Sequence, residues 1–173
     1  QAQIDLWEFS HLVTSRPVPN DFGTWDWTPA FEAARIMLGN LGGGDLTFGT
    51  GGVYQARYIR LDRSIVLNGR GVNATELKQI EGTNSDFIKS ENFDFLTGTG
   101  LTTADSRVPS WMGLKDIRVN GNRYNAKTNP GGNRSGVPVK LYGPSMILAG
   151  TVLIYDGAGG GLYTEDSTKA SGV

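Results

Sequence analysis

The chain has 173 residues, with 16 Lys and Arg against 17 Asp and Glu, and it contains no cysteine. A near-neutral chain lacks the basic surplus needed to bind nucleic acid or an anionic membrane, so we expect neither partner. Without cysteine it can form no disulfide and no thiolate zinc site. We therefore predict no metal and no cofactor. Twenty-five glycines and only 19% charged residues are typical of a turn-rich β protein, long enough for one domain with its own core.

Residues 1–20 combine an apolar set with Pro17 and Pro19. The apolar members are Ile4, Leu6, Trp7, Phe9, Leu12 and Val13. Because prolines interrupt regular structure, we expect an extended linker here. His11, the only histidine, has no acidic or nucleophilic neighbour in the sequence, which favours a surface or packing role over catalysis.

The spacing predicts one helix, over residues 28–39. Thr28 suits its N-cap, Pro29 its first position and Gly39 its C-terminal cap. An apolar stripe at helical spacing is formed by Ala30, Phe31, Ala34, Met37 and Leu38. Trp25 and Trp27 precede the helix; they suit stacking on sugars or sealing the core, and their place beside a helix favours the second.

From residue 41 to residue 80, short β-type runs recur at intervals of roughly ten residues, separated by glycine turns. Strands of this kind suit a coiled chain in which each turn stacks on the previous one, since a single turn cannot bury its own apolar face. Six short motifs appear in order over residues 21–80: Asp21-Phe22-Gly23, Trp25-Asp26-Trp27-Thr28, Gly42-Gly43-Gly44, Leu46-Thr47-Phe48, Gly52-Val53-Tyr54 and Ile65-Val66-Leu67-Asn68-Gly69-Arg70-Gly71.

This ordered set resembles the opening of the pectate-lyase-like right-handed parallel β-helix family, in the group found in bacteriophage tailspikes and secreted polysaccharide lyases. The resemblance implies an all-β fold: the N-terminal coils of a right-handed parallel β-helix, with the helix over 28–39 as its cap. It also implies that residues 1–20 are a junction segment and that residues 21–173 are the N-terminal part of the β-helix.

The later chain follows the same pattern more loosely. We expect strands within 87–88, 93–96, 113–119, 137–141, 147–149, 152–154 and 161–163, and loops at 97–107 and 123–136. At roughly 20–25 residues per coil, about five coils fit. The chain begins at Gln1 and ends at Val173 without a capping element. We therefore expect it to be a piece of a longer protein.

The resemblance implies a phage tailspike that recognises and depolymerises a bacterial capsule or O-antigen, with hydrolysis favoured. It implies a homotrimer in the virion, attached through its N-terminus to a phage tail or baseplate protein. Two alternatives stay open: a non-enzymatic receptor-binding shaft protein, and a secreted polysaccharide lyase or epimerase. No apolar run approaches membrane-spanning length, and the first residues lack the signal-peptide pattern, which counts against the secreted enzyme.

Polysaccharide cleavage needs either a pair of carboxylates or a base that removes the proton beside a uronic carboxyl group. Asp156, Glu165 and Asp166 follow predicted strands, so carboxylates from adjacent coils are predicted to form the catalytic pair. Alginate-epimerase-like relatives carry Asp-Pro-His at the matching position, and here the histidine is missing, which favours a hydrolase. The alternative is that these acids only solvate a loop.

Cations and aromatic residues surround the loop at 123–136. Trp111, Arg123, Tyr124 and Arg134 are our candidates for binding an acidic sugar chain, with Arg118 and Lys127 nearby. A solvated loop of mixed charge is the alternative.

Overall fold

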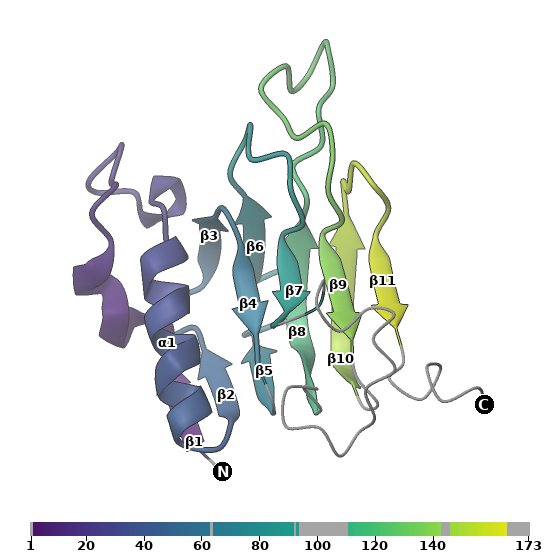
Figure 1. Cartoon of the computed structure of the whole chain (residues 1–173). Coiled ribbons are helices and arrows are strands. Elements are labelled where there is room, and N and C mark those ends of the chain that lie inside the picture. The colour runs from purple at the N-terminus through teal and green to yellow at the C-terminus, as the bar shows by residue number, and fades with distance from the viewer. Residues whose placement is uncertain (1, 63, 92, 94–110, 143–145, 166–173) are drawn as a thin grey trace.

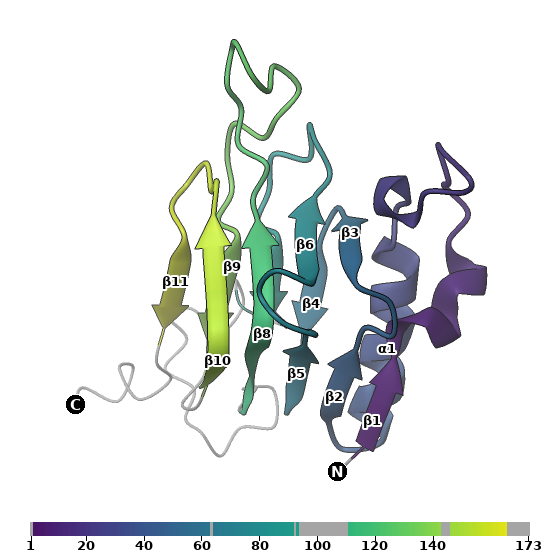
Figure 2. The same cartoon turned by 180° about the vertical axis from the view of Figure 1, so that it is seen from behind.

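The structure is a computed structural model that describes residues 2–62, 64–91, 93, 111–142 and 146–165 (Figure 1). Its parallel strands form two facing sheets. Sheet A contains β1 (Ala2–Asp5), β2 (Gly44–Thr47), β3 (Gly52–Ala56), β5 (Ile65–Asn68), β6 (Thr75–Gln79), β8 (Met112–Asn120) and β10 (Met146–Tyr155). Sheet B contains β4 (Ile59–Leu61), β7 (Ile88–Ser90), β9 (Val139–Tyr142) and β11 (Leu162–Glu165). The strands of the two sheets run in opposite directions (Figure 2).

A ladder of aliphatic side chains sets the register of sheet A. Ile4 pairs with Leu46, Leu46 with Leu67, Leu67 with Leu114, and Leu114 with Leu148. The first four are buried in the core, where α1 covers β1 and β2. Because side chains alternate along a strand, a slip of one residue would turn this whole row toward solvent.

The chain passes from sheet A to sheet B repeatedly, as the stacked-turn prediction requires, but at unequal intervals. Gly44 pairs with Ile65, whereas Val66 pairs with Gly113, and Gly113 with Ile147. Four such passages occur within the described residues, against the five even coils predicted. Long connections after β7 and β8 lengthen the later turns. The predicted strand at 93–96 lies outside the described residues except for Phe93.

The predicted helix is present as α1 (Thr28–Asn40), which packs against β1, β2 and β4 at one end of the sheets (Figure 1). Its start differs in detail, because Asp26 provides the cap: its Oδ1 atom accepts hydrogen bonds from the Thr28 backbone nitrogen (3.0 Å) and hydroxyl (2.5 Å). Pro29 occupies the first turn as expected. Most of the predicted stripe is buried, but Met37 is 44% exposed. None of the described helices is long and apolar enough to cross a membrane.

The prediction of an extended linker over residues 1–20 is wrong for residues 2–12. β1 pairs in parallel with β2, and the 3₁₀ helix η1 (Leu6–Leu12) packs against α1. Leu6 and Phe9 are buried in the core. The apolar spacing of this segment therefore reflects packing, and the prolines act only on the residues after η1.

Five aromatic side chains tie η1, η2 (Phe22–Thr24) and β3 together: Trp7, Phe22, Trp25, Trp27 and Tyr54. Trp27 is fully buried, with ring centroids 4.9 Å from Trp7, 5.6 Å from Trp25 and 5.2 Å from Tyr54. Its indole nitrogen donates to the Phe22 carbonyl (3.0 Å), and that of Trp7 to the Tyr54 hydroxyl (2.8 Å). The packing role predicted for Trp25 and Trp27 is confirmed.

We predict that Trp27→Ala lowers the free energy of unfolding by about 3–5 kcal/mol, because it leaves a large cavity among buried rings. Trp111→Ala is the matched control, since that side chain is 60% exposed, and it should change the free energy by less than about 0.5 kcal/mol. Denaturant unfolding measures both, and equal midpoints for the two variants would contradict the assignment.

Candidate functional site

The outer face of sheet A presents polar side chains where β6 begins and where β8 and β10 approach their C-terminal ends. Glu76 of β6 pairs with Arg118 of β8, which pairs with Leu153 of β10. The next residues along β6 and β8, Leu77 and Val119, are fully buried in the core. By alternation, Glu76 and Arg118 face outward.

Glu76, Arg118 and Tyr155 form one contact group, which we call the Glu76 cluster. The Tyr155 hydroxyl donates a hydrogen bond to Glu76 Oε1, and Arg118 Nε lies 3.5 Å from the same oxygen. Arg118 Nε makes no hydrogen bond within the described part of the chain, so its contact with Glu76 is an ion pair. The Glu76 side chain is only 11% exposed, which strengthens both contacts.

The Glu76 cluster changes the acidity of its phenol. Burial, the hydrogen bond to Glu76 and the negative charge of Glu76 raise the pKa of Tyr155 from 10.0 to about 12. The charge of Asp156 adds to this rise, and that of Arg118 opposes it. Tyr155 therefore stays protonated at neutral pH and serves as a hydrogen-bond donor.

Asp156, a predicted catalytic residue, follows β10 directly and has a positive φ of 51°. The segment 121–136, which we call the arginine loop, begins beside it. The Gly121 nitrogen donates to the Tyr155 carbonyl (3.0 Å), and a Cβ at Gly121 would lie 2.6 Å from the Asp156 carbonyl oxygen. Only glycine therefore lets the loop start this close to Asp156.

The arginine loop extends beyond the strand ends, at the top of Figure 1. The Arg134 guanidinium carbon lies 3.5 Å from the centroid of the Tyr124 ring, a close cation–π contact. Arg123 and Arg134 are exposed. The loop thus presents two cations and an aromatic ring, and it begins beside Tyr155 of the Glu76 cluster. Substrate binding by Arg123, Tyr124 and Arg134 stays a prediction.

Buried asparagines hold the arginine loop in place. Asn133, 1% exposed, donates to the Gly121 carbonyl (3.1 Å) and the Ile80 carbonyl (3.2 Å), and it accepts from the Asn84 nitrogen (2.9 Å). Asn122 in turn donates to the Gln79 carbonyl (2.9 Å). Such contacts order a long loop that has no strand of its own.

Two of the remaining predicted residues, Trp111 and the backbone of Glu165, lie away from this site. Trp111 precedes β8 while Arg123 follows it, so about 30 Å of extended strand separates them. Glu165 ends β11 on sheet B, and the backbone of β11 runs away from the turn at Asp156 for about 10 Å before it reaches Glu165. Asp166 lies outside the described residues. Trp111 was misplaced because spacing along the sequence ignored the length of β8.

Glu76 and Tyr155 were not among the residues predicted from the sequence. In the sequence, each of them shows only a polar position in an alternating strand. Because the turns differ in length, the sequence does not indicate that β6, β8 and β10 are neighbours. His11 is exposed on η1, which lies against α1 and so away from β6, β8 and β10. Among the described residues, no three His, Asp or Glu side chains come together as a metal site.

Two solved structures resemble this fold, while no protein-family model matches the chain. The A-module of the mannuronan C-5 epimerase AlgE4 from Azotobacter vinelandii superposes with a TM-score of 0.55 and 16% identity over 94% of this chain and 50% of its own. The AlgE6 A-module from the same organism gives 0.51 and 17% over 84% and 42%.

The chain therefore spans about half the length of these structures or less. At this identity the likeness concerns the fold alone. It confirms a mostly β protein with parallel strands in curled sheets and few helices, related in architecture to parallel β-helix proteins.

We predict that Glu76→Gln lowers the pKa of Tyr155 from about 12 toward 10.0, because the variant removes the negative charge while burial remains. The ultraviolet absorbance of the phenolate measures this, with Tyr155→Phe subtracted to remove the other tyrosines. The unfolded chain ionises first, so stability should fall as pH rises from about 10 through about 12, and less so in Glu76→Gln. Identical titrations in both proteins would contradict the Glu76 contact.

Proposed function

We propose that this protein is the N-terminal part of a right-handed parallel β-helix that binds and hydrolyses a bacterial surface polysaccharide. The observation that carries the proposal is the Glu76 cluster, placed beside Asp156 and the arginine loop on the outer face of sheet A. A second observation supports it: both similar folds belong to epimerases that are named for a polysaccharide, mannuronan.

Hydrolysis uses two carboxyl groups, one that protonates the glycosidic oxygen and one that acts as base or nucleophile. Both Glu76 and Asp156 are close to Tyr155. Glu76 accepts a hydrogen bond from the Tyr155 hydroxyl, and Asp156 is the next residue in the chain, whose charge acts on the same phenol. Tyr155 and Arg118 orient Glu76, which suits the role of base or nucleophile. Asp156, at the exposed turn that follows β10, is the second carboxyl group.

The cations of the arginine loop favour an acidic sugar chain. Arg123 and Arg134 present guanidinium groups, which bind carboxylates through paired hydrogen bonds. Tyr124 is already covered on one face by Arg134, so its contribution is to position that guanidinium. We infer that a uronate or sialate unit binds here, next to the bond that is cleaved.

Elimination or epimerisation is the alternative reaction, and it needs a base to remove the proton beside a uronic carboxyl group. The raised pKa of Tyr155 makes that phenol a poor base at neutral pH. Hydrolysis by the two carboxyl groups is therefore our first choice.

The six ordered motifs over residues 21–80 support a narrower proposal, that the protein is a tailspike of a phage virion. In that case it forms a homotrimer and attaches through its N-terminus to a tail or baseplate protein. We expect a trimer for the full-length protein in light scattering, and a monomer would contradict the tailspike assignment but not the hydrolase.

We predict that Glu76→Gln and Asp156→Asn each lower kcat by about 100-fold or more, as expected for loss of a general acid or base. Glu165→Gln is the matched control, with the same chemical change on the other sheet, and it should keep full activity. Capsular and O-antigen polysaccharides and polymannuronate serve as substrates, and new reducing ends measure cleavage.

Three other readouts separate the alternatives. Ultraviolet absorbance of an unsaturated sugar would indicate a lyase, and a changed ratio of uronate epimers without cleavage would indicate an epimerase. Binding without any reaction would leave a receptor-binding protein. Loss of activity in Glu165→Gln alone would contradict the site proposed here.

A further inference from the structure

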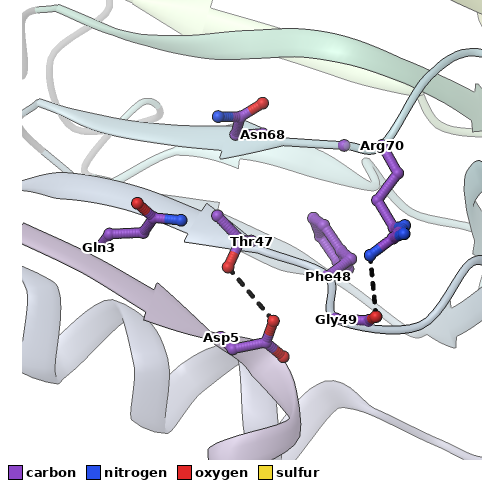
Figure 3. Close-up of a pocket in the computed structure, with 8 residues that line it drawn as sticks. Gln3, Asp5, Thr47, Phe48, Gly49, Asn68 and Arg70 are labelled. Atoms are coloured by element: carbon purple, nitrogen blue, oxygen red, sulfur yellow. Dashed lines mark hydrogen bonds between the residues drawn. The ribbon is translucent and has the colours of Figure 1, made fainter.

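A polar pocket of about 260 Å³ lies on the outer face of sheet A, where β1, β2 and β5 end (Figure 3). Its polar side chains are Gln3, Asp5, Thr47, Asn68 and Arg70. The pocket belongs to different strands from the Glu76 cluster, which lies on β6, β8 and β10. The proposed reaction uses none of its residues.

Hydrogen bonds hold several of these side chains in fixed positions. The Asp5 carboxylate accepts hydrogen bonds from the Trp7 backbone nitrogen (2.9 Å) and from the Thr47 hydroxyl (3.3 Å). Figure 3 shows the second of these contacts. Arg70 Nη1 donates to the Gly49 carbonyl (2.9 Å). The pocket is therefore arranged before a ligand arrives, which lowers the entropic cost of binding.

Gly49 keeps space open beside Asp5. A Cβ at this position would lie 2.9 Å from Asp5 Oδ2, closer than real contacts allow. With glycine, the turn after β2 passes the carboxylate without displacing it. The Gly49 backbone and the Asp5 carboxylate therefore both line the pocket.

Donors and acceptors converge on the same space. The Gln3 amide makes no hydrogen bond to the part of the chain that the structure describes, and its side chain is exposed. Asn68 uses its amide nitrogen on Asp45 Oδ2 (3.1 Å), which leaves its carbonyl oxygen to accept. Arg70 has further N–H groups, and Asp5 further lone pairs. Hydroxyl groups, which donate and accept together, match this mixture.

The charges favour an uncharged ligand. Among the residues that line the pocket, Asp5 is an acid and Arg70 is the only cation, and Asp45 accepts a hydrogen bond from the Asn68 amide. A ligand carboxylate would be repelled by both acids. The volume is below the range of about 300–1,000 Å³ typical for drug-sized ligands, so it suits one sugar ring.

We propose that this pocket binds one uncharged pyranose ring. Combined with the proposed function, on which this step rests, it implies a polysaccharide with both neutral and acidic sugars. The neutral unit is held at β1, β2 and β5, and the acidic unit at the arginine loop. Binding of a free neutral sugar does not depend on any cleavage activity.

The test is an NMR titration of the protein with the methyl glycosides of glucose, galactose and mannose, and with glucuronate. At least one neutral glycoside should bind with a millimolar Kd. The Kd of glucuronate should be higher by about fivefold or more. Gln3→Ala and Asn68→Ala should each weaken binding by about fivefold, as loss of one hydrogen bond predicts. Asn40→Ala is the matched control, because it removes a side-chain amide at the end of α1, outside the pocket. This variant should bind as the unaltered protein does.

Far-ultraviolet circular dichroism confirms that each variant is folded. The proposal is overturned if none of the neutral glycosides binds, if glucuronate binds more tightly than they do, or if Gln3→Ala binds as well as Asn40→Ala. Cleavage by a protein that binds no neutral sugar would overturn the pocket alone. Neutral-sugar binding by a protein whose Glu76→Gln variant keeps full activity would support the pocket and contradict the proposed catalytic role of Glu76.

Discussion

The inward row of Ile4, Leu46, Leu67 and Leu114 is the constraint on which the rest of sheet A depends. These side chains stack at the strand spacing of about 4.8 Å and are buried in the core. Burial of this row fixes the register of β1, β2, β5 and β8, and the buried pair Leu77 and Val119 does the same for β6 against β8. The register in turn fixes which side chains face outward. The polar pocket follows from the first of these two packed rows, and the Glu76 cluster follows from the second.

The loops decide what this regular scaffold can recognise. Parallel strands alone would present a flat polar face, but the long connection after β8 places Arg123, Tyr124 and Arg134 beside the ends of β8 and β10. Buried asparagines replace strand pairing as the source of order in that connection. A rigid scaffold with an ordered inserted loop is the usual arrangement of a binding site in β proteins.

Local signals in the sequence predicted local structure well. The helix over residues 28–39 begins at the same residue as α1 and ends one residue earlier, because its apolar spacing and Pro29 act within a single turn. Trp25 and Trp27 were correctly assigned to packing. The failure at residues 1–20 has the same origin: two prolines outweighed the apolar pattern of Leu6 and Phe9, although prolines act only on their neighbours.

By itself, the sequence determined a β-rich chain of short stacked strands, one capping helix and a cationic, aromatic loop, since alternation, glycine turns and composition are all readable from adjacent residues. Only the tertiary structure decided that Glu76, Arg118 and Tyr155 meet and that the backbone of Glu165 lies elsewhere. The reason is physical: contacts across a parallel sheet depend on which turn stacks on which, and turns of unequal length leave no fixed spacing from which to infer it.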